Sequence, residues 1–155
     1  MSAICYGRRQ LIRTVVAGAV LAVVATPFAV TAGEKPAATL YKNPQCGCCE
    51  EYAAYLRQHG YRVTVKPTHD LALINRQHGV PQNLEGCHTT LIDGYVVEGH
   101  VPVKTIDRLL TERPAIKGVS LPGMPQGSPG MTGAKNAPFT IYEISNGTPR
   151  VYAVE

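Results

Sequence analysis

The sequence has no Trp and only two Phe, and charged residues occupy 17% of its 155 positions. Its formal charge of +4 depends on the N-terminus: without Arg8, Arg9 and Arg13, the 15 basic residues fall to 12, against 11 acidic ones. A nearly neutral body argues against nucleic-acid binding, which requires a concentrated basic face. No Gly-rich phosphate loop, pair of catalytic carboxylates or Ser-His-Asp arrangement is evident, which leaves nucleotide-binding and hydrolytic sites without support.

The N-terminus has the layout of an export signal. The arginines precede an apolar run over residues 15–30, and Val30-Thr31-Ala32 provides small or apolar residues for cleavage. We therefore predict a signal peptide over residues 1–32 and a mature periplasmic chain over residues 33–155, with no membrane attachment after cleavage. Arg8-Arg9 resembles a twin-arginine signal, and general secretion is equally compatible. The alternative is a retained anchor, but the run is only about as long as the ~18-residue minimum for a bilayer span, and Thr26-Pro27 interrupts it.

Hydrophobic periodicity predicts an α/β domain. Alternating residues indicate strands, and apolar residues at helical spacing indicate helices. The predicted strands cover residues 38–41, 61–66, 89–92 and 95–97, and the predicted helices cover residues 48–59, 70–78 and 102–113. Their order, β-α-β-α-β-β-α, is that of a thioredoxin-like fold.

A C-terminal extension begins near residue 118. Nine of the 21 residues from Gly118 to Pro138 are Gly or Pro, so this stretch is predicted to be an irregular loop. Residues 139–144 and 151–154 flank Asn146-Gly147 and predict a terminal β-hairpin. The domain over residues 33–155 is therefore expected to combine a thioredoxin-like part, a Gly/Pro-rich loop and this hairpin.

Three cysteines within four residues, Cys46, Cys48 and Cys49, precede or begin the first predicted helix. A helix N-terminus stabilises thiolates, which are both nucleophiles and ligands for soft metals. The spacing of Cys46 and Cys49 is that of a thioredoxin-type redox pair. A third sulfur beside such a pair would invite mispairing, whereas a soft-metal site would use it. A structural disulfide or an inert core cysteine is the remaining alternative.

Further soft donors lie downstream. Cys87-His88 precedes the third predicted strand, in a loop that faces the start of the first helix in thioredoxin-like folds. Met124 and Met131 lie in the Gly/Pro-rich segment, and thioethers select copper(I) over zinc. The alternatives are that Cys87 is a small buried hydrophobe, that His88 only bonds the loop and that the methionines fill a groove. His100, which enters the last predicted helix, could serve in packing or in a site.

Four motifs occur in order and together resemble the CopG-like family: residues 41–49 (YKNPQCGCC), 85–89 (EGCHT), 99–102 (GHVP) and 121–131 (LPGMPQGSPGM). These are exported, thioredoxin-like copper-resistance proteins, often assigned to a domain of unknown function. The resemblance implies a cysteine-bridged, multinuclear copper site and interconversion of copper(I) and copper(II). By position it implies metal ligands at Cys46, Cys48, Cys49 and Cys87, with His88, Met124 and Met131 as weaker carry-overs.

The sequence thus favours a periplasmic copper-binding protein that serves copper resistance. Its expected partners are copper ions and periplasmic copper-handling or electron-transfer proteins. The main rival is a thiol-disulfide oxidoreductase using Cys46 and Cys49. A zinc or mercury buffer is a third possibility, because four thiolates bind zinc well, although the methionines would then have no role.

Overall fold

The computed structural model describes residues 34–155 of the chain. The predicted signal peptide and its cleavage site lie outside the described residues. Within the described part, no helix combines the length and the apolar character that a membrane crossing requires.

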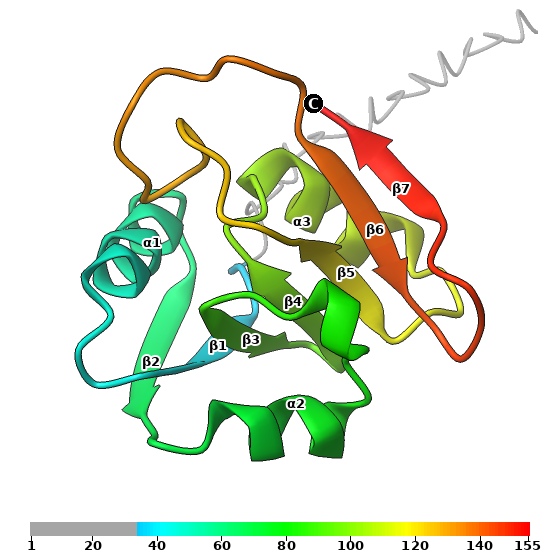
Figure 1. Cartoon of the computed structure of the whole chain (residues 1–155), viewed down its shortest axis with the longest axis horizontal. Coiled ribbons are helices and arrows are strands. Elements are labelled where there is room, and N and C mark those ends of the chain that lie inside the picture. The colour runs from blue at the N-terminus through cyan, green and yellow to red at the C-terminus, as the bar shows by residue number, and fades with distance from the viewer. Residues whose placement is uncertain (1–33) are drawn as a thin grey trace, which may run out of the picture. The chain divides into compact units, whose positions relative to one another are not determined.

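The described chain forms one seven-stranded mixed sheet with three α-helices (Figure 1). The elements are β1 (Ala37–Lys42), α1 (Gly47–Gln58), β2 (Arg62–Pro67), α2 (Leu71–His78), a 3-10 helix (Gln82–Leu84), β3 (His88–Ile92), β4 (Tyr95–Gly99), α3 (Val103–Glu112), β5 (Gly118–Leu121), β6 (Thr140–Ile144) and β7 (Val151–Val154). The predicted order of the first four strands and three α-helices is therefore confirmed, and so is the terminal hairpin.

The strands lie in the order β2-β1-β3-β4-β5-β6-β7. The prediction that residues 118–138 are irregular throughout is wrong at its start, because β5 lies inside the sheet, parallel to β4 and antiparallel to β6. The glycine at position 118 allows close approach of two backbones and does not mark a turn, since a Cβ there would overlap the carbonyl of Val96. The C-terminal extension therefore continues the same sheet.

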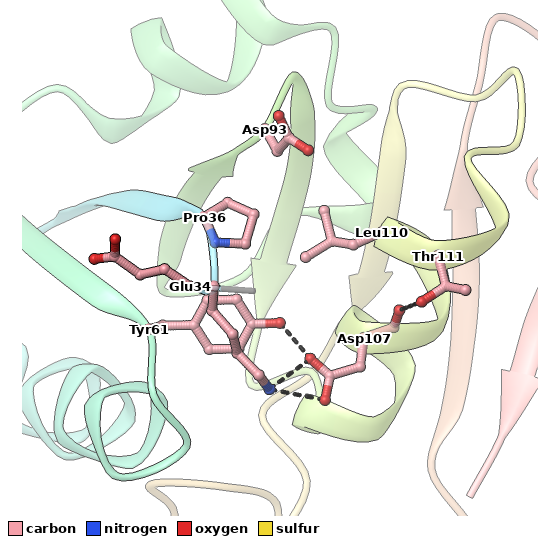
Figure 2. A pocket seen from close by; sticks show the side chains of 8 residues that line it. Glu34, Pro36, Tyr61, Asp93, Asp107, Leu110 and Thr111 are labelled. Carbon is pink, nitrogen blue, oxygen red and sulfur yellow. Dashed lines mark hydrogen bonds and ion pairs between the residues drawn. The ribbon is translucent and has the colours of Figure 1, made fainter. Parts of the chain in front are cut away.

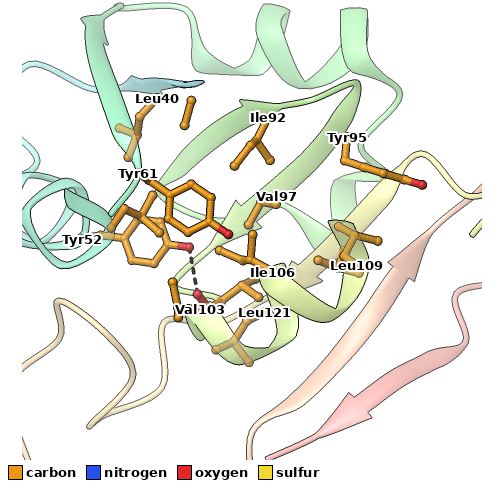
Figure 3. Close-up of a cluster of buried hydrophobic side chains, with 14 of the residues drawn as sticks. Leu40, Tyr52, Tyr61, Ile92, Tyr95, Val97, Val103, Ile106, Leu109 and Leu121 are labelled. Atoms are coloured by element: carbon orange, nitrogen blue, oxygen red, sulfur yellow. Dashed lines mark hydrogen bonds between the residues drawn. The ribbon is translucent and has the colours of Figure 1, made fainter. Parts of the chain in front are cut away.

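Helices α1 and α3 pack on one face of the sheet, over the main hydrophobic core (Figure 3). Apolar residues of α1 recur at helical spacing and are buried: Cys49, Tyr52, Ala53 and Leu56. A smaller cluster on the other face joins Val80 and Leu84 to Val96 and Ile144. Neighbouring residues Val96 and Val97 thus enter opposite clusters, as the alternation of a strand requires.

The register of β1, β3 and β4 brings three chain segments together at one end of these strands. Lys42 at the end of β1 pairs with His88 at the start of β3, so the loop before α1 lies beside Cys87. Thr89 pairs with Glu98, which brings the end of β4 and His100 to the same end. The sulfur-bearing and imidazole-bearing segments therefore meet because the strands that carry them are neighbours.

Tyr52 links α1 to the segment after β4. Its side chain is fully buried, and its hydroxyl donates a 2.9 Å hydrogen bond to the carbonyl of Val101. Its ring lies 4.5 Å from the ring of His88 and 5.4 Å from that of His100, measured between centroids. Burial raises the pKa of Tyr52, so the hydroxyl stays protonated and able to donate. Tyr52 thus packs against both histidines while its hydroxyl is satisfied.

Replacing Tyr52 with Phe should lower the free energy of unfolding by about 1–3 kcal/mol, because the buried carbonyl of Val101 would lose its donor. Tyr55→Phe is the matched control: Tyr55 accepts a 2.9 Å bond from the amide of Val103 but is only half-buried, so water can replace it. Urea unfolding of both variants checks this. Equal losses in both would contradict the role given to burial.

Candidate metal centre

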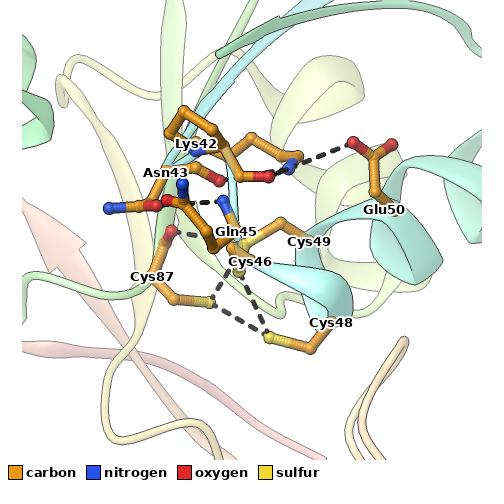
Figure 4. Close-up of polar contacts among 9 residues, drawn as sticks. Lys42, Asn43, Gln45, Cys46, Cys48, Cys49, Glu50 and Cys87 are labelled. Atoms are coloured by element: carbon orange, nitrogen blue, oxygen red, sulfur yellow. Dashed lines mark hydrogen bonds and ion pairs between the residues drawn. A yellow bond between two sulfur atoms is a disulfide. The ribbon is translucent and has the colours of Figure 1, made fainter. Parts of the chain in front are cut away.

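The loop between β1 and α1 is held by a buried cation. Lys42 is only 2% exposed, and its ammonium group donates to the carbonyls of Asn43 and Pro44 at 3.1 and 3.2 Å (Figure 4). It also pairs with Glu50 of α1 at 3.1 Å, which satisfies its charge. The amide of Cys46 donates to the carbonyl of Asn43 at 3.0 Å, closing the turn. These contacts hold the backbone of the loop that leads to Cys46.

Four sulfur atoms converge at the start of α1, all within 4.8 Å of one another. Cys46 and Cys49 form a disulfide, while Cys48 and Cys87 are free. The Cys48 sulfur lies 3.5 Å from that of Cys46 and 3.8 Å from that of Cys87, and the sulfurs of Cys49 and Cys87 are 3.6 Å apart (Figure 4). The sequence prediction that these four cysteines share one site is consistent with this geometry.

Cys87 also belongs to a second group of potential ligands. Its sulfur, with the imidazoles of His88 and His100, offers three ligand atoms within 4.8 Å. The sulfur lies 3.4 Å from Nδ1 of His88 and 3.2 Å from Nε2 of His100. Cys87 is therefore placed to bridge between a sulfur-rich group and a group with two imidazoles.

The structure fixes the protonation of His100. Its Nδ1 lies 2.6 Å from the carbonyl of Pro129, and because a carbonyl can only accept, Nδ1 carries the proton. Nε2 is therefore unprotonated, and its lone pair faces the sulfur of Cys87. Burial lowers the pKa of both His88 and His100, so both rings are neutral at neutral pH, the form in which imidazole binds metals. For His88, the neighbouring His100 is a second cause.

Burial raises the pKa of the Cys87 thiol to about 12, and the nearby Cys48 adds to the increase. Without a metal this thiol is therefore protonated at neutral pH and is a poor nucleophile. A bound soft cation would displace the proton, because the ligand is the thiolate. The environment of Cys87 thus suits metal binding better than thiol exchange.

A buried carboxylate supports the loop that carries Cys87. Glu98 is fully buried, and its Oε1 accepts a 2.7 Å hydrogen bond from the amide of Gly86. Its pKa is raised to about 7, chiefly by burial. A Cβ on Gly86 would come within 3.0 Å of the Cα of Gly99, so the absence of a side chain lets this loop lie against the end of β4.

The Gly/Pro-rich segment passes beside α1 (Figure 1). Gly130 has a φ of +80°, and a Cβ there would lie 2.6 Å from the amide nitrogen of Tyr52 and 3.0 Å from the carbonyl oxygen of Cys48. This close approach brings the preceding residue, Pro129, into contact with His100. Met131 follows and is half-buried, whereas Met124 is 42% exposed.

The structure brings some of the predicted ligands together and leaves the two methionines apart from them. The structure brings together Cys46, Cys48, Cys49, Cys87 and His88. Met124 and Met131 are placed only on the neighbouring segment, and their ligation stays a prediction. His100, which the sequence left between packing and a site role, lies at the centre. In the sequence, His100 directly follows a predicted strand. That this strand ends beside Cys87 depends on the register of the sheet, which the sequence does not give.

A pocket of about 370 Å³ lies elsewhere, between the start of β1 and α3 (Figure 2). Its lining includes Lys35, Tyr61 and Asp107, with the Lys35 ammonium 2.7 Å from the Asp107 carboxylate and the Tyr61 hydroxyl donating to the same group. No Cys or His lines it. The candidate metal centre is therefore a cluster of donors and not this cavity.

Residues 84–131 match a family model described as a protein of unknown function, DUF411. No curated protein matches the chain significantly. Two solved structures match it, both of a copper resistance protein CopG, in form 2 and form 1. Each is 35% identical to this chain and covers 79% of it. The match spans 99% of form 2 and 98% of form 1, with TM-scores of 0.73 and 0.72.

If Cys87, His88 and His100 hold a metal, Gly130→Ala should weaken the binding of added copper(I) by about 10-fold or more, because it would push Pro129 away from His100, and losing the partner of a metal-binding histidine typically costs ~10–100-fold. Gly123→Ala is the control: Gly123 also has a φ of +80°, but nothing lies within 4 Å of its Cβ position. Competition with a copper(I) chelator measures both. A loss of affinity that is equal in the two variants would show that backbone strain, and not the contact with α1, is responsible.

Proposed function

The chain belongs to the CopG family of copper resistance proteins, and on that basis we propose that it binds copper at the centre formed by its cysteines and histidines. The observation that carries the proposal is the convergence of four sulfurs with the imidazole nitrogens of His88 and His100 at one end of β1, β3 and β4. We further propose that it is exported to the periplasm and serves copper resistance there; the predicted signal peptide supports the location.

The donor set fits copper(I). Thiolates are soft ligands that select copper(I), zinc or iron–sulfur clusters, and neutral imidazole suits copper as well. Carboxylates, which hard cations such as magnesium and calcium require, take no part in either ligand group. The members of both groups are half-buried or buried, which limits competition from water.

We propose that the centre holds more than one copper ion. Cys87 is common to the sulfur group and the imidazole group, and a thiolate can bridge two cations. The full sulfur group becomes available only when the Cys46–Cys49 disulfide is reduced. A centre of this kind would bind several copper(I) ions with a small net charge.

Interconversion of copper(I) and copper(II) is a further part of the proposal. The group of Cys87, His88 and His100 combines one thiolate with two imidazoles, a donor set that redox-active copper sites use. Of the two methionines we propose Met131 as the additional ligand, because it is half-buried and follows Gly130, which lies against α1, whereas Met124 is 42% exposed. Periplasmic copper-handling or electron-transfer proteins are the expected partners.

A thiol-disulfide oxidoreductase is the second candidate, and the Cys46–Cys49 disulfide favours it. Two observations oppose it. The third sulfur, of Cys48, lies 3.5 Å from that of Cys46, where it would compete with an incoming thiol. Cys49 is fully buried and Cys87 lies 3.6 Å from it, so the pair is enclosed by other sulfurs.

Cys87→Ser should remove more than one equivalent of copper, because the loss of a bridging sulfur disrupts both ligand groups and effects within one network are not additive. Met124→Leu should remove less, since its side chain is 42% exposed and a neutral thioether is a weaker ligand. Metal analysis of protein purified from copper-fed cells without chelator gives the stoichiometry. Unchanged copper content and affinity in Cys87→Ser would contradict the shared site.

Two assays on copper-free and copper-loaded protein separate the two candidate functions. The copper proposal predicts a copper(II) electron paramagnetic resonance signal that appears on oxidation and vanishes on reduction without loss of metal. The rival predicts brisk insulin disulfide reduction by copper-free protein, retained in Cys48→Ser but lost in Cys46→Ser. Copper that stays silent under both treatments would leave binding intact and refute interconversion.

A further inference from the structure

We propose that the Cys46–Cys49 pair is the electron donor for copper(II): as a dithiol it reduces two copper(II) ions, and in doing so it forms the disulfide seen in the structure. The inference rests on the proposed copper-binding function and adds to it the source of the electrons. It assigns different roles to the two pairs of sulfurs at one centre.

The four sulfurs already differ in oxidation state. Cys46 and Cys49 are joined, and Cys48 and Cys87 are free although their sulfurs lie only 3.8 Å apart. The free pair is the one associated with the imidazoles, because the Cys87 sulfur lies 3.2 Å from Nε2 of His100. One pair therefore carries the redox change, while the other stays with the nitrogen ligands.

The reaction balances without any further reagent. Two copper(II) ions each take one electron, the S–H bonds of Cys46 and Cys49 break, one S–S bond forms between them, and two protons are released. The products are two copper(I) ions and the disulfide. A small dithiol that reaches the half-buried sulfur of Cys46 is the chemical class of reductant that would return the pair to its reduced form.

The spacing provides short routes for the electrons. Each member of the pair is next to a different free sulfur: Cys46 is 3.5 Å from Cys48, and Cys49 is 3.6 Å from Cys87. Copper bound at either free sulfur is therefore adjacent to the pair. Cys49 is fully buried, which disfavours attack by a protein thiol but does not prevent transfer to an ion inside the centre.

After the disulfide has formed, the centre still offers ligands for the copper(I) that is produced. Cys48, Cys87 and His100 remain as donors after the disulfide has formed, and this soft set favours copper(I) over copper(II). The second group of ligands, which includes His88, is likewise unaffected by the disulfide. The centre can therefore reduce copper and still hold it.

The test uses purified protein reduced completely, freed of reductant and titrated with copper(II) without oxygen. Copper(I) is measured with a chromophoric chelator after the remaining thiols have been alkylated, and the disulfide is mapped by mass spectrometry. We expect two copper(I) ions per chain, loss of two of the four thiols of the centre, and a disulfide between Cys46 and Cys49. Unfolded protein is the control, because its thiols should react without this selectivity.

Two double variants assign the roles. Cys46→Ser/Cys49→Ser should bind fewer copper(I) ions, through Cys48, Cys87 and the imidazoles, and should reduce less than a tenth as much copper(II). Cys48→Ser/Cys87→Ser lacks the sulfurs that hold copper beside the pair, so it should reduce copper(II) more slowly, still form the Cys46–Cys49 disulfide, and release the copper(I). Direct binding of copper(I) by the first variant shows that its remaining site is folded.

The possible outcomes separate this inference from the function on which it rests. Bound copper with all four thiols retained, or a disulfide mapped to Cys48 and Cys87, would overturn the inference and leave copper binding intact. No copper bound in either oxidation state would overturn the proposed function itself. Copper(I) formation with the mapped Cys46–Cys49 disulfide supports both.

Discussion

The centre depends on the pairing of β1 with β3. Because Lys42 lies opposite His88, the last residue of one strand and the first of the next are neighbours, and the loops attached to them must meet. The cysteines of the α1 N-terminus and Cys87 are 38 or more positions apart in sequence, yet their sulfurs lie within 4.8 Å. A register shift of one residue would turn the side chains of β3 to the opposite faces of the sheet and separate the donors.

Three buried polar side chains around the centre, Lys42, Glu98 and Tyr52, are each held by at least one hydrogen bond. Lys42 is buried but has three oxygen partners, and Glu98 is buried but accepts from the amide of Gly86. Tyr52 covers both imidazoles with an aromatic ring and directs its own hydroxyl away to Val101. Burial raises the pKa of the Cys87 thiol and lowers that of both imidazoles, so these three groups are neutral until a cation arrives, and a cation that binds the thiolate displaces its proton.

Sequence periodicity predicted helices α1 and α3 because each buries one apolar face, and the terminal hairpin because its turn residues are distinctive. It failed at β5, where Gly118 serves backbone packing and not a turn. The cysteines of the centre could be grouped from their spacing and the expected fold. His100 could not be chosen over other histidines, since its role follows from strand register and from a carbonyl, that of Pro129, 29 positions away. The spacing of Cys46 and Cys49 marked them as a possible pair. That they are joined while Cys48 and Cys87 stay free depends on the distances among four similar sulfurs, which the sequence does not give.

The distribution of donors along the chain has a consequence for folding. In small zinc domains the metal supplies much of the energy that orders the chain, and removing it unfolds them. Here the donors are attached to a sheet and a hydrophobic core that include Leu40, Val97 and Ile106, far more extensive than the centre itself. The chain can therefore fold first and acquire metal afterwards, and none of the binding energy is consumed in ordering the backbone. A protein built in this way can release its cargo without unfolding.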